Sequence, residues 1–178
     1  MAGITGFNAF IKNALKYGFS LFGLPKTGQT IIYKDGDDGF YQKGYPKSGP
    51  RFKDNGDGTV TDLATGLMWV QDSDGEGCNF GEGLVWEDAI DFCEQLEFAG
   101  YSDWRLPNIH ELHSIIDVSV LLPSIDPIFI NTKSDYYWAS TTCSEDALDA
   151  KMVTFEKSIT YLDTKDREHY VRPVRGGV

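Results

Sequence analysis

The sequence predicts an α+β domain with twisted antiparallel strands, two main helices and long loops. Two segments, 86–96 and 109–116, carry apolar residues at helical spacing. Around them, short runs rich in β-branched and aromatic residues are separated by turns rich in glycine and aspartate, which is typical of antiparallel strands. A chain of 178 residues with 4 tryptophans, 9 tyrosines and 11 phenylalanines is long and apolar enough for one domain with a substantial core.

Residues 1–24 have the pattern of an additional amphipathic helix. Apolar side chains recur at three- and four-residue steps between Phe7 and Phe22, while Lys12 and Lys16 lie on the other face. Such a helix packs on its own domain, on a neighbouring subunit as an oligomerisation segment, or on a membrane surface, and the pattern leaves these alternatives open. Lys16 interrupts the apolar run, so the segment does not form a clear signal peptide.

Residues 25–50 are predicted to be an extended lead-in to the main domain, which spans 51–178. A short strand is expected at 29–33 and a turn at 35–39, where glycine and aspartate alternate. Residues 42–50 are rich in glycine, proline and lysine and indicate a loop that lies over the domain.

The main domain is predicted to begin with a three-stranded meander. Its strands are expected at 51–53, 59–62 and 67–70, because Asn-Gly and Asp-Gly pairs between them favour turns with positive φ. Three aspartates of this region, Asp54, Asp57 and Asp62, are also candidate calcium ligands. Their spacing does not fit the EF-hand pattern, so turn formation remains the alternative interpretation.

The segment between the two predicted helices contains the most informative residues of the chain. The first helix begins at Trp86 and is expected to stop at Gly100. Asp103, Trp104, Arg105 and Pro107 follow, combining a large apolar side chain with a cation, a carboxylate and a residue that cannot continue a strand ladder.

Asn108 is predicted to start the second helix. It is a good N-cap, and Glu111 stands three residues later, as in a capping box. Four more strands are expected after this helix. They are 136–140, then 151–155 and 158–162 as a hairpin turning at Glu156–Lys157, and 169–174. We interpret eight residues of these elements as structural: Trp69, Trp86, Asp103, Trp104, Arg105, Pro107, Trp138 and Arg172.

Composition narrows the range of functions. The net charge of −11 disfavours nucleic acid as a partner, because an acidic surface repels phosphates. No apolar run reaches the length of about 18 residues that a transmembrane helix needs. Cys78, Cys93 and Cys143 permit one disulfide without indicating which pair forms it, and no zinc-binding spacing is present. His110 and His113 are one helical turn apart but do not make the HExxH motif.

Several blocks, taken in order, resemble one protein family. The first blocks are Arg51-Phe52, 54–62 and 65–69. The middle blocks are 86–90 and 100–107 with Glu111-Leu112. The last blocks are 137–140 and 171–175. These blocks are similar to the Legionella collagen-like protein C-terminal domain family. The resemblance covers about 51–175, and the 24–30 segment also resembles the region that precedes the domain in many members.

The resemblance implies a C-type-lectin-like fold related to formylglycine-generating enzymes, whose loops present a binding face. Members are typically bacterial or phage-borne and exported, which implies a location at the cell surface or outside the cell. The name-giving member is a trimeric adhesin for sulfated polysaccharides, which implies a homo-oligomer, with the trimer as the form that the resemblance suggests. Its anionic ligand does not suit a chain of charge −11, so we do not transfer that ligand.

The expected function is therefore a non-catalytic binding or adhesion module for a carbohydrate or a protein surface, with calcium as the one candidate cofactor. One alternative is a structural component of a phage or cell-surface assembly. A second is an oxidoreductase of the formylglycine-generating type, which needs a copper-binding cysteine pair near the C-terminal end. Only Cys143 lies near that end of the chain, so this second alternative is weakly supported.

Overall fold

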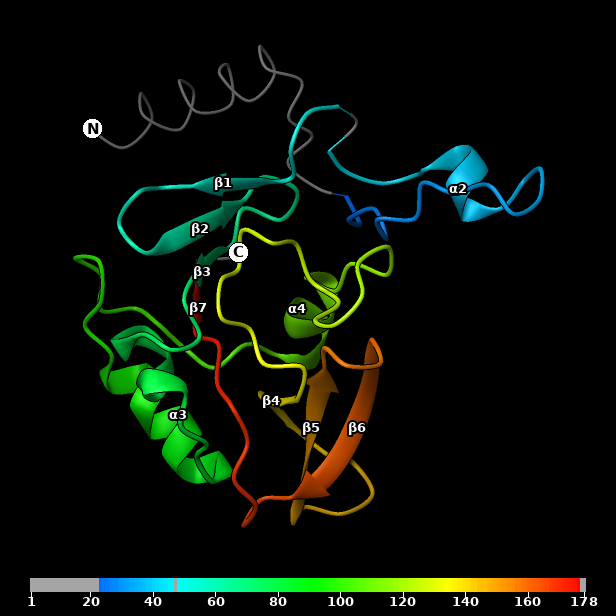
Figure 1. Cartoon of the computed structure of the whole chain (residues 1–178). Coiled ribbons are helices and arrows are strands. Elements are labelled where there is room, and N and C mark those ends of the chain that lie inside the picture. Colours follow the sequence, from blue (N-terminus) through cyan, green and yellow to red (C-terminus); the bar gives the residue numbers. More distant parts are fainter. Residues whose placement is uncertain (1–22, 47, 177–178) are drawn as a thin grey trace, which may run out of the picture.

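The computed structural model describes residues 23–46 and 48–176 and confirms an α+β fold with two antiparallel sheets (Figure 1). The helix predicted at 1–24 lies almost entirely outside the described residues. One sheet has the strand order β1–β2–β3–β7 and the other β4–β5–β6. The elements are α2 Asp38–Tyr41, β1 Phe52–Asp54, β2 Thr59–Asp62, β3 Met68–Val70, η1 Glu76–Gly81, α3 Trp86–Gln95, α4 Ile109–Ser114, β4 Tyr136–Thr142, β5 Asp149–Thr154, β6 Ile159–Thr164 and β7 Val174–Arg175.

The predicted meander and the predicted hairpin are both confirmed. In the meander, β1 pairs with β2 and β2 pairs with β3, with Val60 opposite Trp69. In the hairpin, β5 and β6 pair along six residues each, from Asp149 opposite Thr164 to Thr154 opposite Ile159. In both cases the paired strands are joined by a short turn whose residues favour that turn. The conformation favoured locally by the sequence therefore agrees with the tertiary packing.

The predicted strand at 169–174 is wrong, because this segment pairs with several partners in turn. Its Tyr170 forms a parallel bridge with Tyr137 of β4, whereas Val174 pairs with β3 and also exchanges two backbone hydrogen bonds with Arg105. Pro173 between them has no N–H to donate to a regular ladder. The segment consequently connects the two sheets, and only Val174–Arg175 counts as a strand.

Buried apolar side chains from both sheets and from α4 form the main core. Trp69, Val60, Leu112, Tyr137 and Phe155 are all fully buried in it. A second cluster lies between α3 and the β4–β5 face and contains Trp138 with Cys93 and Val171. The core is thus shared by the two sheets, which holds the loops between them in fixed positions.

Helix α3 is confirmed, but its predicted stop at Gly100 is wrong. The helix ends at Gln95, since Leu96 already has an extended backbone and its amide bonds back to Cys93 O at 3.3 Å. Gly100 instead has a φ of +79° in a turn across which Phe98 and Tyr101 exchange backbone hydrogen bonds. Glycine is favoured at Gly100 for this turn rather than as the cap of α3.

Helix α4 has the predicted capping box. The Asn108 side chain accepts hydrogen bonds from the amides of His110 and Glu111, and the Glu111 carboxylate accepts one from the Asn108 amide. The helix is shorter than the apolar pattern suggested, because Ile115 and Ile116 lie beyond its last residue and are buried there.

Removing this cap is expected to destabilise the protein measurably. An Asn108→Ala variant should lower the free energy of unfolding by about 1 kcal/mol, because the amides at the start of α4 lose their acceptor. Urea denaturation followed by fluorescence would measure the loss. Asn108→Ser keeps an acceptor oxygen and should cost much less; an equal loss in both variants would contradict a capping role.

Residues 24–45, which we call the arm, project from the domain beside β1 (Figure 1). Its two ends are joined by hydrogen bonds between Leu24 O and Tyr45 N and between Lys26 N and Tyr45 O. The strand predicted at 29–33 is wrong, because Tyr33 N and Lys34 N donate to the Asp37 side chain instead of to a strand partner. The turn predicted at 35–39 runs into the short helix α2.

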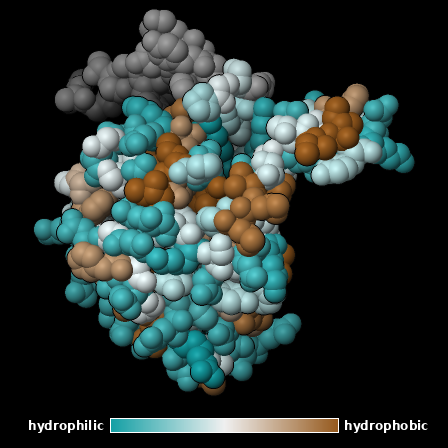
Figure 2. All heavy atoms as spheres, viewed as in Figure 1, coloured by the Kyte–Doolittle hydropathy of each residue, from teal (hydrophilic) through white to brown (hydrophobic). Residues whose placement is uncertain are grey.

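Large apolar side chains are exposed along this arm. Figure 2 shows hydrophobic residues on the arm around α2, with hydrophilic residues at the tip beyond them, and a further hydrophobic group on the body near the base of the arm. Within the part of the chain that the structure describes, no helix is long and apolar enough to cross a membrane.

Candidate ligand-binding groove

The structure does not bring the three predicted calcium ligands together. In the register of β1 and β2, Asp54 lies opposite Val60 and Asp62 lies opposite Phe52, so the two carboxylates are at opposite ends of the pair. Across residues 23–46 and 48–176, no three His, Cys, Asp or Glu side chains are grouped so as to hold a metal ion. The predicted calcium site at Asp54, Asp57 and Asp62 is therefore wrong.

Each of these aspartates has a local structural partner instead. Asp62 is fully buried and receives Arg51 on both oxygens, at 3.0 and 2.6 Å. Asp54 accepts from the Gly56 amide, and Asp57 accepts from the amide and the hydroxyl of Thr59. The turn interpretation thus describes Asp54 and Asp57, while Asp62 forms an ion pair that joins β2 to the segment before β1.

The residues around Trp104 connect α4, β7 and the loop after α3. Trp104 is buried, and its indole N–H donates to Phe98 O at 3.1 Å. Arg105 forms a two-point ion pair with Glu111 at 2.7 and 2.6 Å, which raises the pKa of Arg105 through those hydrogen bonds. Asp103 pairs with Arg175 at 2.6 and 3.0 Å.

Arg172 is a fully buried cation, and none of the ion pairs found among residues 23–46 and 48–176 includes it. Its guanidinium donates to Val70 O at 2.8 Å, to Gln71 O at 3.0 Å and to the hydroxyls of Ser73 and Thr132. Its guanidinium carbon, Cζ, lies 5.1 Å from the centroid of the Phe129 ring and 5.8 Å from that of the Tyr137 ring. These contacts join the segment that contains Arg172 to residues 70–73 and to the loop that contains Phe129 and Thr132.

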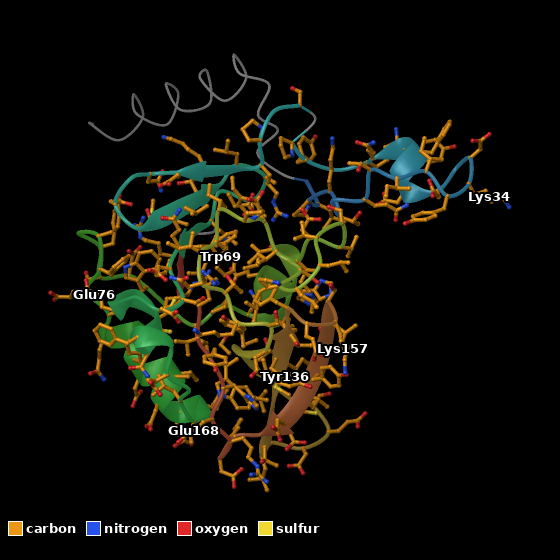
Figure 3. All side chains as sticks on the ribbon, in the orientation of Figure 1. Lys34, Trp69, Glu76, Tyr136, Lys157 and Glu168 are labelled. Atoms are coloured by element: carbon orange, nitrogen blue, oxygen red, sulfur yellow. The ribbon has the colours of Figure 1, made fainter. Side chains whose placement is uncertain are left out.

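The candidate ligand site is a groove at the end of the molecule opposite the arm, where α3 and β5 begin and β6 ends (Figure 1). Its volume is about 570 Å³. Figure 3 labels Glu168 at this end, on the turn that follows β6. We call it the groove, and it is lined by Val85, Glu87, Ala147, Leu148, Thr164, Lys165 and Asp166.

Lys165 fixes the walls of the groove relative to one another. Its amide donates to Leu148 O at 2.9 Å, and its carbonyl accepts from the Trp86 amide at 3.0 Å. Its ammonium group donates to Thr142 Oγ1 at 3.0 Å and lies 4.0 Å above the Trp86 ring. One residue therefore joins β4, the loop before β5 and the first turn of α3.

Two further contacts hold the segments next to the groove in place. Trp138 is buried and its indole N–H donates to Leu84 O at 2.9 Å, next to the groove residue Val85. His169 Nε2 lies 2.9 Å from Asp163 Oδ2. Although burial opposes the effect, hydrogen bonds from His169 and from the Thr164 amide lower the pKa of Asp163. These contacts consequently attach the segments next to the groove, at Leu84 and His169, to β4 and β6.

The groove combines apolar and polar lining in the way that small-ligand sites do. Leu148 is 72 % exposed although it is a large apolar residue, and Ala147 and Val85 flank it. Glu87 and Asp166 provide acceptors, and the hydroxyl of Thr164 is occupied by Asp166 at 2.5 Å. Such a surface can hold an uncharged or cationic group by apolar contact and by hydrogen bonds.

Sequence reasoning predicted structural roles for Trp86 and Trp138, but it missed the residues that line the groove. The one available signal was Leu148, an apolar side chain within the otherwise polar loop from Cys143 to Asp149. Nothing in the sequence pairs Lys165 and Asp166, which follow β6, with the start of α3.

Comparison with known proteins identifies one family. Residues 58–175, more than half of the chain, match the family model for the Lcl C-terminal domain. No curated protein matches the chain.

Proposed function

The chain belongs to the Lcl C-terminal domain family, and from this premise we propose that it is a non-catalytic binding module that holds a carbohydrate or a protein surface in the groove. The observation that carries the proposal is the groove itself, with its exposed Leu148 and its walls fixed by Lys165. Its volume of about 570 Å³ falls in the range of about 300–1,000 Å³ typical of ligand sites.

The charge of the domain favours uncharged or cationic ligands. Residues 1–47 contain six lysines and three aspartates and therefore carry a net charge of +3. Because the whole chain carries −11, residues 48–178 carry −14. A polyanion would be repelled by this field, whereas a neutral sugar or a lysine-bearing peptide would not.

The cysteines support a non-catalytic role over the formylglycine-generating alternative. Cys78, Cys93 and Cys143 are all buried free thiols. Burial raises the pKa of Cys78 to about 12 and also raises the pKa of Cys93, so these two groups carry little of the thiolate that metal binding and thiol oxidation require.

The assembly alternative is favoured by a different observation, the apolar side chains on the arm. It concerns another surface, so a protein that uses its arm for assembly still has the groove free for a ligand.

Glycan and peptide arrays probed with the full chain would test the proposal directly. We expect binding to neutral glycans or to basic peptides, and Leu148→Ser should weaken the affinity by about tenfold, because losing most of a buried leucine contact costs about 1.5 kcal/mol. Calorimetry on the best array hit would measure this change.

A matched control is available on the neighbouring strand. Leu162 of β6 is also exposed but does not line the groove, so Leu162→Ser should leave the affinity unchanged. Blank arrays, or an equal loss of affinity in both variants, would contradict a ligand site in the groove.

A further inference from the structure

The arm has a fixed internal structure of its own. The Asp37 carboxylate accepts from the amides of Tyr33, Lys34 and Phe40. Gly39 is buried within the arm, and a Cβ there would lie 2.0 Å from Ile31 O, so the two sides of the arm approach closely. The hydrogen bonds from the amides lower the pKa of Asp37, which keeps the acceptor charged. The arm is thus preformed, and its shape does not depend on a partner.

The outer end of this preformed arm exposes an unusual amount of apolar surface. Tyr33 is 79 % exposed, and Ile31, Ile32, Phe40 and Tyr41 are each at least half exposed. Figure 3 labels Lys34 at the outer end, well away from the body of the domain. Contiguous apolar surface of this kind on a soluble protein marks an interaction site.

A second apolar surface lies on the body at the base of the same arm. It comprises Val118, Leu121 and Leu122 of the loop after α4, which we call the base patch. The Val118 amide donates to Thr27 O at 3.0 Å, so the base patch adjoins the arm where it leaves the domain. Leu121 is 85 % exposed, and Figure 2 shows both hydrophobic groups on one face of the molecule.

This arrangement fits a second copy of the same chain. A two-fold axis midway between the outer end of the arm and the base patch places the arm of each copy on the base patch of the other. The arm carries three lysines and three aspartates and is neutral, while residues 48–178 carry −14. Contact through neutral arms avoids the repulsion that two acidic bodies would meet face to face.

The apolar area that one arm can bury is too small for a specific dimer, so two reciprocal contacts are needed. Three aromatic side chains, each worth roughly 150–250 Å² when buried and here at least half exposed, give the arm on the order of 400 Å² to bury. One arm on one patch then buries about 800 Å² in total, which is typical of weak lattice contacts, whereas two bury about 1,600 Å², the size of a standard specific interface.

We propose that the protein forms a two-fold homodimer in which each arm packs its outer end on the base patch of the other copy. The interface consists of the aromatic side chains Tyr33, Phe40 and Tyr41 with Ile31 from one copy, and of the base patch Val118, Leu121 and Leu122 from the other. The dimer leaves both grooves open, because the groove lies at the opposite end of the molecule from the arm (Figure 1).

Light scattering on the full-length chain tests this interface. The parent protein should have the mass of two copies of 19.9 kDa each. Tyr33→Asp and Leu121→Asp should each raise the dimer dissociation constant at least about tenfold, because a charge in an apolar contact is poorly solvated there. Both side chains are exposed in the single copy, so circular dichroism should show an unchanged fold.

A control and a cross-link sharpen the result. Phe80 is 69 % exposed on η1, away from the arm, so Phe80→Asp should leave the mass at two copies. A chain carrying both Tyr33→Cys and Leu121→Cys should form a covalent dimer on oxidation. A parent mass of one copy, or of three or more, would overturn the proposal, and so would a dimer that persists in both aspartate variants.

Discussion

The Arg172→Met variant is expected to lose about 3–5 kcal/mol of unfolding free energy. The guanidinium donates to two carbonyls and two hydroxyls, and methionine offers no donor to any of them. Each buried polar group left unpaired costs about 1–3 kcal/mol, partly recovered here by the apolar side chain. Since domains of this size have about 5–15 kcal/mol in total, the expected loss is a large fraction of the stability of the protein.

Urea denaturation monitored by tryptophan fluorescence would measure this loss. Arg175→Met is the matched control, because Arg175 makes its ion pair with an exposed carboxylate, Asp103. Water replaces such a partner readily, so the control should lose far less stability than Arg172→Met. Equal losses would show that the buried hydrogen bonds of Arg172 contribute no more than a surface pair.

The Trp104→Ala variant is expected to lose about 3–5 kcal/mol, the usual cost of removing a large buried aromatic side chain. Trp104 packs against Phe98 and Tyr101 at ring distances of 6.1 and 6.5 Å and holds the loop between α3 and α4. Its indole N–H donates to Phe98 O inside that loop. The cavity left by alanine would open next to Val70 and Cys78 of the same cluster.

A second substitution separates packing from hydrogen bonding at this position. Trp104→Phe keeps an aromatic ring but removes one of the two hydrogen bonds to Phe98 O, which retains the one from the Tyr101 amide. It should therefore cost about 1–3 kcal/mol and less than alanine. Chemical denaturation of both variants gives the comparison. A loss below about 1 kcal/mol for Trp104→Ala would be typical of an exposed side chain and would contradict a central structural role.

The elements that could be predicted from the sequence are those whose signal lies within a few residues. The capping box at Asn108 and Glu111 needs only a three-residue spacing, and the β5–β6 hairpin needs only alternation on either side of Glu156–Lys157. Burial of Trp69 and Trp138 follows from their size and their strand context.

The groove and the arm could not be predicted in this way. The groove joins Val85, Leu148 and Lys165, which are far apart in sequence. They meet because the start of α3 and the loop before β5 both bind the backbone of Lys165, just after β6. The predicted calcium site failed for a related reason. Spacing alone does not give the strand register, and that register places Asp62 beside Arg51 and away from Asp54.

The arm shows how one side chain can override local propensity. Residues 29–33 are rich in residues favoured in strands, yet the Asp37 carboxylate binds the amides of Tyr33 and Lys34 and fixes a different backbone. A sequence pattern of apolar residues could therefore indicate an ordered segment here, but not its conformation.

Because all three cysteines are buried free thiols, we expect the folded chain to react slowly with thiol reagents. With the pKa of Cys78 near 12, almost none of this thiol is ionised at neutral pH. Alkylation of the thiols should therefore require that the domain opens transiently. The native thiols thus act as internal reporters of conformational opening, and their labelling rate gives the frequency of that event without any engineered probe.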